Sequence, residues 1–184
     1  MKATGIVRRI DELGRVVIPK EIRRTQRIRQ GDALEIYTAP DGEVIFKKYS
    51  PVMDLGEITG IYADVLAKNL GAPVLVCDRD VVVAAAGAAR GEKEDLMGRP
   101  ITRELEKLLA ARSVYTAPAD PSRQVRAVSG SGERVLGCAA PILVGGDIEG
   151  GVCVLSSAQG EPPGELQTGA VRIAANFLAR WMEE

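Results

Sequence analysis

The chain has 184 residues, of which 46% are hydrophobic and 4% aromatic, and its formal net charge is −1. This length allows one large domain or two small ones, and no apolar run approaches the ~20 residues that a membrane-spanning helix needs. The N-terminus lacks the apolar core of a signal peptide, so we expect a cytoplasmic protein that does not associate with membranes.

Histidine is absent, and the three cysteines (Cys77, Cys138 and Cys153) are scattered through apolar runs. The commonest general base and the commonest metal ligand are therefore missing. We expect reduced, buried cysteines, no metal, no cofactor and no enzyme activity.

Charge is distributed unevenly along the chain. Residues 1–50 carry eleven Lys or Arg against seven Asp or Glu, a net charge of +4, whereas residues 51–184 carry thirteen against eighteen, a net charge of −5. A basic piece joined to an acidic piece indicates two modules with different partners.

The first module, residues 1–51, shows the pattern of strand, strand, short helix, strand, strand. The Asp-Gly pair in "PDGE" predicts a hairpin turn between the last two strands. The expected strands lie at 4–11, 14–19, 33–39 and 43–48, with the helix starting at Pro19. Because fifty residues with one short helix bury little core, we expect an obligate dimer with interleaved strands.

The sequence pattern of the second module, residues 54–184, predicts an α+β domain with a central antiparallel sheet and helices before, within and after it. Asp54 and Glu57 suggest a capping box for its first helix, and Gly71 a stop. The expected helices lie at 53–71, 101–112 and 164–182, and the strands at 72–78, 80–87, 123–129, 134–144 and 148–157.

The final helix carries two adjacent apolar stripes. One holds Leu166, Ala170, Ile173, Ala174, Phe177 and Trp181, and the other Val171, Ala175, Leu178 and Met182. A face this broad can cover the sheet and still meet a helix of another copy, although a helix well buried in its own domain would show the same pattern.

The basic residues of the first module concentrate around one predicted hairpin and helix. If the first two strands turn at "DELG", they present five arginines and a lysine near the helix start: Arg8, Arg9, Arg15, Lys20, Arg23 and Arg24. Arginine suits phosphate and guanine edges, and a dimer doubles the patch. Three acidic residues, Asp11, Glu12 and Glu21, interrupt the patch, and the alternative is an ordinary solvated charged face.

The stretch "TGIVRRIDELGRVVIPKEIRRT", followed by "GDALEIY" and "GEVIFKKYSP", strongly resembles the DNA-binding domain of AbrB-like transition-state regulators. The resemblance covers residues 1–51 and implies a swapped-hairpin β-barrel dimer that binds double-stranded promoter DNA. It also implies that five of the basic residues contact DNA (Arg8, Arg9, Arg15, Arg23 and Arg24). Lys20 is added from the charge pattern alone.

The remainder, through "GEITGIYADVLAKNLGAPVLVCDRDVVVAAAG" and "ANFLARWMEE", is similar to members of this family that regulate sporulation genes. The resemblance implies a GAF-like domain over residues 54–184 and a tetramer built as a dimer of dimers. The operator, and activation or repression at each promoter, stay open. So does a small-molecule effector, for which the loops at 87–100 and 117–125 would line the cavity.

Two other classes are weighed against a transcription regulator. Related swapped-hairpin domains occur in antitoxins, but those usually carry a disordered tail where this chain has a predicted folded domain. An enzyme is disfavoured by the lack of a nucleophile–base pair.

Overall fold

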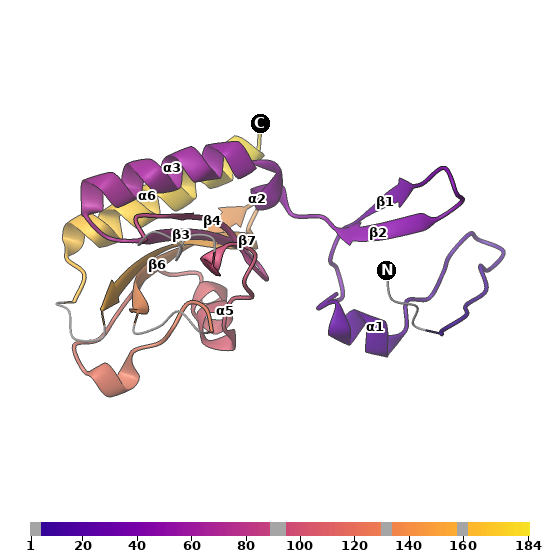
Figure 1. The fold of residues 1–184 in the computed structure, drawn as a ribbon, viewed down its shortest axis with the longest axis horizontal. Coiled ribbons are helices and arrows are strands. Elements are labelled where there is room, and N and C mark those ends of the chain that lie inside the picture. The colour runs from indigo at the N-terminus through magenta and orange to yellow at the C-terminus, as the bar shows by residue number, and fades with distance from the viewer. Residues whose placement is uncertain (1–4, 89–94, 130–133, 158–161) are drawn as a thin grey trace. The chain divides into compact units, whose positions relative to one another are not determined.

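The computed structural model describes residues 5–88, 95–129, 134–157 and 162–184. The chain divides into two compact units, Met1–Tyr49 and Ser50–Glu184, which are described separately below (Figure 1).

The N-terminal unit contains one short helix and one two-stranded sheet. Helix α1 (Lys20–Thr25) follows Pro19, and strands β1 (Leu34–Thr38) and β2 (Val44–Lys48) pair in antiparallel register. Their connection closes through the Ala39 N–H, which donates to the Glu43 carbonyl at 3.0 Å, and it contains Gly42 at φ 86°. The predicted hairpin around "PDGE" is confirmed, since glycine adopts this left-handed conformation without strain.

The two strands predicted at 4–11 and 14–19 are wrong for the single chain. Residues 5–19 form no strand among the described residues, although the predicted turn at "DELG" is present. Within that turn the Gly14 N–H donates to the Asp11 carbonyl, and the Asp11 N–H to the Arg15 carbonyl, each at 3.0 Å. A strand requires a neighbour whose backbone groups match its own, and a single copy does not supply one here.

The C-terminal unit is built on a five-stranded antiparallel sheet in the order β4-β3-β7-β6-β5. Its strands are β3 (Val74–Asp78), β4 (Val82–Ala86), β5 (Tyr115–Thr116), β6 (Arg134–Val144) and β7 (Asp147–Ser157). Its helices are α2 (Pro51–Asp54), α3 (Gly56–Leu70), α5 (Arg103–Ala110), α6 (Glu165–Met182) and a 3₁₀ turn at Pro121–Arg123. The predicted α+β class with an antiparallel sheet and flanking helices is confirmed.

Helices cover both faces of this sheet. Helices α3 and α6 lie side by side over one face (Figure 1), where Leu66 and Leu178 join the core with Val76 and Val154. Helix α5 covers the other face through Leu105 and Leu109. The two predicted stripes of α6 separate in part: Val171, Ala175 and Leu178 are buried, and Leu166, Ile173, Phe177 and Trp181 are exposed. The predicted stripe of Leu166 and Trp181 also includes Ala174, which is buried in the core.

Two local predictions in this unit are wrong. Asp54 does not cap the first long helix: it ends α2, and α3 begins at Gly56 without a side-chain cap. The cap falls on Ser50, whose hydroxyl accepts from the Met53 N–H, because Pro51 starts a separate helical turn.

Residues 123–129 are not a strand. Pro121 opens a 3₁₀ turn that extends to Arg123, and at Cys138 and Ala139 the outer edge of β6 pairs with β5 instead. The predicted segment makes an isolated bridge between Ile101 and Val128. It also makes single backbone hydrogen bonds, in which the Val125 carbonyl accepts from the Leu136 N–H at 2.8 Å and the Ala127 carbonyl from the Thr102 N–H at 2.9 Å. The two residues of β5 are too few for a sequence pattern to identify.

Gly150→Ala should strongly destabilise the C-terminal unit. A Cβ at Gly150 would overlap the carbonyl oxygen of Cys77 on the neighbouring strand, so β3 and β7 would have to separate. Such overpacking costs about 1–3 kcal/mol or more. The measurement is urea unfolding followed by the fluorescence of Trp181, the single tryptophan.

The matched control is Gly60→Ala in α3, where a Cβ meets nothing within 4 Å. It should raise the free energy of unfolding by roughly 0.5–1 kcal/mol, because alanine favours helix. Equal stability of the two variants would contradict the β3–β7 register described here.

Candidate nucleic-acid interface

All six predicted DNA-binding residues are exposed in the N-terminal unit. Arg8 and Arg9 lie on the first arm of the loop, and Arg15 begins the second. Lys20 opens α1, whose last turn holds Arg23 and Arg24. Basic side chains thus occupy both arms and the helix that follows them, as a polyanion-binding surface requires.

The turn between the two arms is organised by Asp11. One carboxylate oxygen, Oδ1, accepts from the backbone N–H groups of Leu13 (3.0 Å) and Arg15 (2.8 Å), and Oδ2 accepts from Arg15 Nε at 2.8 Å. The backbone and then the side-chain hydrogen bond of Arg15 lower the pKa of Asp11. Gly14 completes the turn at φ 75°.

Sequence reasoning missed this role of Asp11 and counted it only as an acid that interrupts the basic patch. The signal that identifies it is an Asp followed by Gly three positions later, which is typical of a turn whose first residue bonds the backbone ahead.

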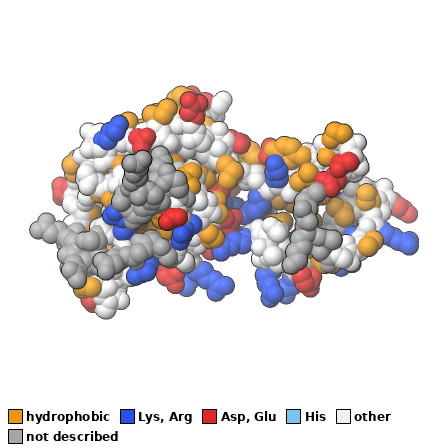
Figure 2. Space-filling model, in the orientation of Figure 1, with side chains coloured by type: hydrophobic (Ala, Val, Ile, Leu, Met, Phe, Trp, Pro, Cys, Tyr) orange, Lys and Arg blue, Asp and Glu red, His pale blue; other side chains and the backbone are white. Residues whose placement is uncertain are grey.

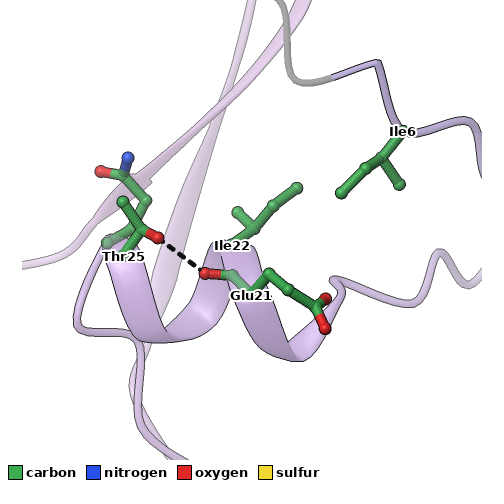
Figure 3. Close-up of a pocket in the computed structure, with 5 residues that line it drawn as sticks. Ile6, Glu21, Ile22 and Thr25 are labelled. Carbon is green, nitrogen blue, oxygen red and sulfur yellow. Dashed lines mark hydrogen bonds between the residues drawn. The ribbon is translucent and has the colours of Figure 1, made fainter.

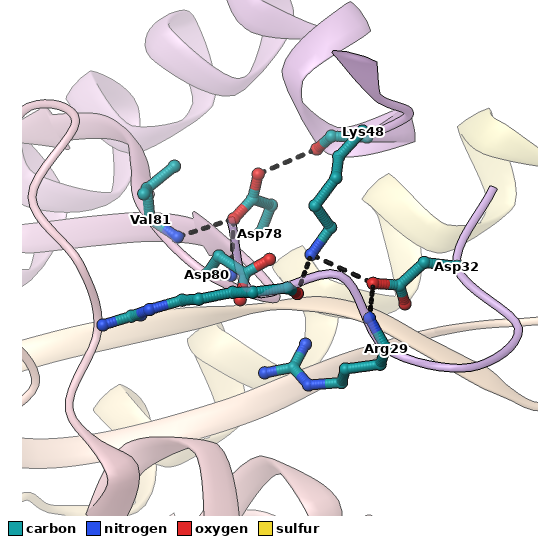
Figure 4. A network of polar contacts seen from close by, with 8 residues as sticks. Arg29, Asp32, Lys48, Asp78, Asp80 and Val81 are labelled. Atoms are coloured by element: carbon teal, nitrogen blue, oxygen red, sulfur yellow. Dashed lines mark hydrogen bonds and ion pairs between the residues drawn. The ribbon is translucent and has the colours of Figure 1, made fainter. Parts of the chain in front are cut away.

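A different basic residue, Lys48, is held within the unit (Figure 4). Lys48 Nζ lies 3.2 Å from Asp32 Oδ2 and donates to the Arg27 carbonyl at 3.1 Å. The Arg29 N–H donates to the same Asp32 oxygen at 2.8 Å. Since the Asp32 side chain is 2% exposed, this network fixes the loop between α1 and β1, and Lys48 has a structural role there.

Apolar side chains are exposed beside these arginines. Val7 is 84% exposed and Val17 72%, and Figure 2 shows hydrophobic side chains at the surface of this unit next to Lys and Arg. Ile6 and Ile22 face each other across a notch of about 250 Å³ beside α1 (Figure 3). One copy of this unit therefore leaves its hydrophobic surface largely uncovered.

The described residues of the C-terminal unit contain no metal centre. No group of three His, Cys, Asp or Glu side chains there could hold a metal ion. No described helix has both the length and the hydrophobicity for a membrane span. The segment 89–94, in one of the two loops named for an effector, lies outside the described residues.

Comparisons with known proteins assign both units. A family model described as "Stage V sporulation protein T C-terminal, transcription factor" matches residues 54–183. The stage V sporulation protein T of Bacillus subtilis (strain 168) is 49% identical over the whole of both chains. The chain belongs to the stage V sporulation protein T family. The resemblance to sporulation members of the AbrB-like regulators is thereby confirmed.

The N-terminal unit has relatives of its own. The transition state regulatory protein AbrB of Bacillus subtilis (strain 168) is 51% identical over 76 residues, which cover 41% of this chain and 77% of AbrB. A second model, described as "Antidote-toxin recognition MazE, bacterial antitoxin", matches residues 7–54. The unit is AbrB-like, as its motifs predicted.

The C-terminal unit shares its fold with GAF domains. A crystal structure of a GAF domain/HD domain protein from Geobacter sulfurreducens matches 70% of this chain and 91% of that one, with a TM-score of 0.53 and 16% identity. At this identity the likeness concerns the fold alone, and the GAF-like prediction is confirmed at that level.

The cysteines of this unit should resist alkylation in the folded protein. All three are buried, and burial raises the pKa of Cys138 to about 12, so its thiolate is scarce at pH 8. Hydrogen bonding with Cys77, then burial, raises the pKa of Cys153 as well. Iodoacetamide at pH 8 should label none of them within minutes in the native state and all three in urea, as counted by mass spectrometry. Rapid labelling of the native chain would contradict the described core.

Proposed function

We propose that the chain is a DNA-binding transcription regulator of sporulation genes. Residues 1–51 act as the DNA reader, and residues 54–184 as the oligomerisation and sensor domain. The observation that carries the proposal is the exposed basic hairpin and helix of an AbrB-like unit, joined to a domain whose family is described as a transcription factor.

Arginine supplies the recognition chemistry. Arg8, Arg9, Arg15, Arg23 and Arg24 are exposed, and each offers a planar fork of N–H donors to phosphate oxygens or to guanine in the major groove. Lys20 adds a charge at the start of α1. Phosphate contacts position the protein, while base contacts and DNA deformability select the sequence.

Dimerisation is required by the uncovered apolar side chains of the reader. Ile10 and Leu13 are exposed along with Val7 and Val17, on the two arms that lack strand partners. A second copy whose arms interleave with these would bury them and supply the missing backbone partners, forming a swapped-hairpin barrel. It would also place two basic surfaces on one duplex.

A second interface lies on the outer face of α3 and α6. Ile61 and Val65 are exposed on α3, and Ile173 is 65% exposed on α6. Phe177 stacks on Tyr62 with ring centroids 4.9 Å apart, and both helices share this patch. Pairing this face with the same face of another copy would join two dimers into a tetramer.

A sensor function is supported by two polar atoms near the edge strand of the GAF-like sheet. The Tyr115 hydroxyl and Gln124 Oε1 are buried and have no hydrogen-bond partner in the part of the chain that the structure describes. Unpaired buried polar atoms are rare in proteins, and a small molecule with its own donors and acceptors would satisfy them.

The antitoxin class is favoured by one finding, the match of residues 7–54 to the MazE model. It is disfavoured by the ordered GAF-like domain, in place of the disordered tail expected of such antitoxins. Binding of promoter duplexes by the full chain, without a partner protein, discriminates between the two classes.

Arg23→Ala and Arg24→Ala should each weaken binding to a promoter duplex about tenfold, because each removes a phosphate or base contact worth about 1–3 kcal/mol. Losing a phosphate contact should also reduce the slope of log K against log salt by about 0.9. Fluorescence anisotropy across a salt series measures both.

Arg103→Ala on α5, also exposed, is the matched control and should bind as the unmodified chain does. Unchanged binding by both helix variants, alongside intact oligomers, would move the DNA surface away from α1.

Ile173→Asp should convert tetramers into dimers while leaving each domain folded, because the side chain is mostly exposed in the single chain. A buried unpaired charge is strongly unfavourable in an apolar interface. DNA binding should weaken as well, since linked readers act through effective concentration. Sedimentation velocity gives the oligomeric state, and a variant that stays tetrameric would place the second interface elsewhere.

A further inference from the structure

We propose that Asp11 is a positioning residue for DNA recognition, whose carboxylate holds the Arg15 guanidinium by Nε so that its two terminal nitrogens are presented to DNA as a fixed fork. This inference rests on the proposed function, since it assigns how one of the DNA-binding arginines is oriented.

The contact geometry is specific to one edge of the guanidinium. Asp11 Oδ2 accepts from Arg15 Nε at 2.8 Å, while Oδ1 is occupied by the backbone N–H groups of Leu13 and Arg15. The carboxylate is thereby fixed from two sides by the turn that it closes. The other carboxylate oxygen, Oδ2, bonds the Arg15 side chain, and this hydrogen bond fixes the plane of the guanidinium.

The terminal nitrogens of Arg15 stay available. The side chain is 72% exposed, and among the described residues Nη1 and Nη2 have no hydrogen-bond partner. Two parallel N–H groups in a fixed plane match a guanine edge in bidentate geometry, so the contact inferred for Arg15 is to a base. An arginine that is already oriented loses less side-chain freedom on binding than an unrestrained one.

The charge of Asp11 makes the inference testable. The hydrogen bonds from Arg15 lower the pKa of Asp11, so it is ionised at neutral pH and lies within a surface proposed to contact phosphates. If Asp11 acted only through its charge, removing that charge would tighten DNA binding. If it positions Arg15, removing it must weaken binding, so the two roles predict opposite signs.

The test uses the full chain and a duplex selected by that chain from a random library. Asp11→Asn keeps Oδ1 as an acceptor for the turn and replaces Oδ2, which accepts from Nε, with an amide nitrogen. We expect about tenfold weaker binding to the selected duplex. Binding to a scrambled duplex should be nearly unchanged, and so should the oligomer mass.

Two further variants separate positioning from folding. Arg15→Lys keeps the charge but lacks the fork, and should lose about as much affinity for the selected duplex as Asp11→Asn does. In the Arg15→Ala background Asp11→Asn should cause no further loss, because the group that it positions is gone.

Three results would overturn the inference. Tighter or unchanged binding by Asp11→Asn, while Arg15→Ala weakens binding, would leave Asp11 as a turn residue with a repulsive charge. Full binding by Arg15→Ala, with loss in Arg23→Ala, would remove Arg15 from the interface but keep the proposed function. A chain that selects no duplex at all would refute the proposed function itself.

Discussion

The stability of the N-terminal unit depends on covering hydrophobic surface that a single copy of the chain leaves exposed. Val7, Ile10 and Leu13 lie in the same short loop as Arg8, Arg9 and Arg15, and both kinds of side chain are exposed. Arginine side chains are well solvated, whereas exposure of apolar side chains to water is unfavourable, so the stable state is one in which apolar groups are brought together. In the proposed dimer a second copy would bury these groups, and the arginines on the same arms would then be presented twice. In this account recognition of DNA follows from dimerisation.

The C-terminal unit differs, because it buries a hydrophobic core of its own. It has two apolar layers, one under α3 and α6 and one under α5, so its fold does not depend on a partner. It nevertheless keeps an apolar patch on its outer face, where Phe177 contacts both Tyr62 and Trp181. A domain with a complete core and an apolar outer face fits the proposed role of joining two dimers.

Much of the fold could be predicted from local sequence, and particular residues show why. Gly42 and Gly71 mark the ends of elements because only glycine adopts their left-handed backbone easily, and the stripes of α6 follow helical spacing. The strands expected at 4–11 and 14–19 depend on backbone partners that a single chain does not provide. The short strand β5 depends on its neighbour β6, which a local pattern does not encode. The cap at Ser50 is local, since Ser precedes Pro at the first helical position, and sequence reasoning missed it.

The candidate site was likewise predicted only in part from the sequence. Composition identified the basic residues, and resemblance to a family gave them a role, but neither showed what orients them. Asp11 looked like an interruption of the patch until its three hydrogen bonds placed it at the centre of the turn.

Whether the arms are completed by a second copy is the central claim, and amide hydrogen exchange of the full chain tests it most directly. The account predicts slow exchange at alternating amides of residues 6–10 and 15–18, as in a strand ladder, with faster exchange on dilution. Exchange at the rate of an unstructured peptide in the assembled protein would contradict it.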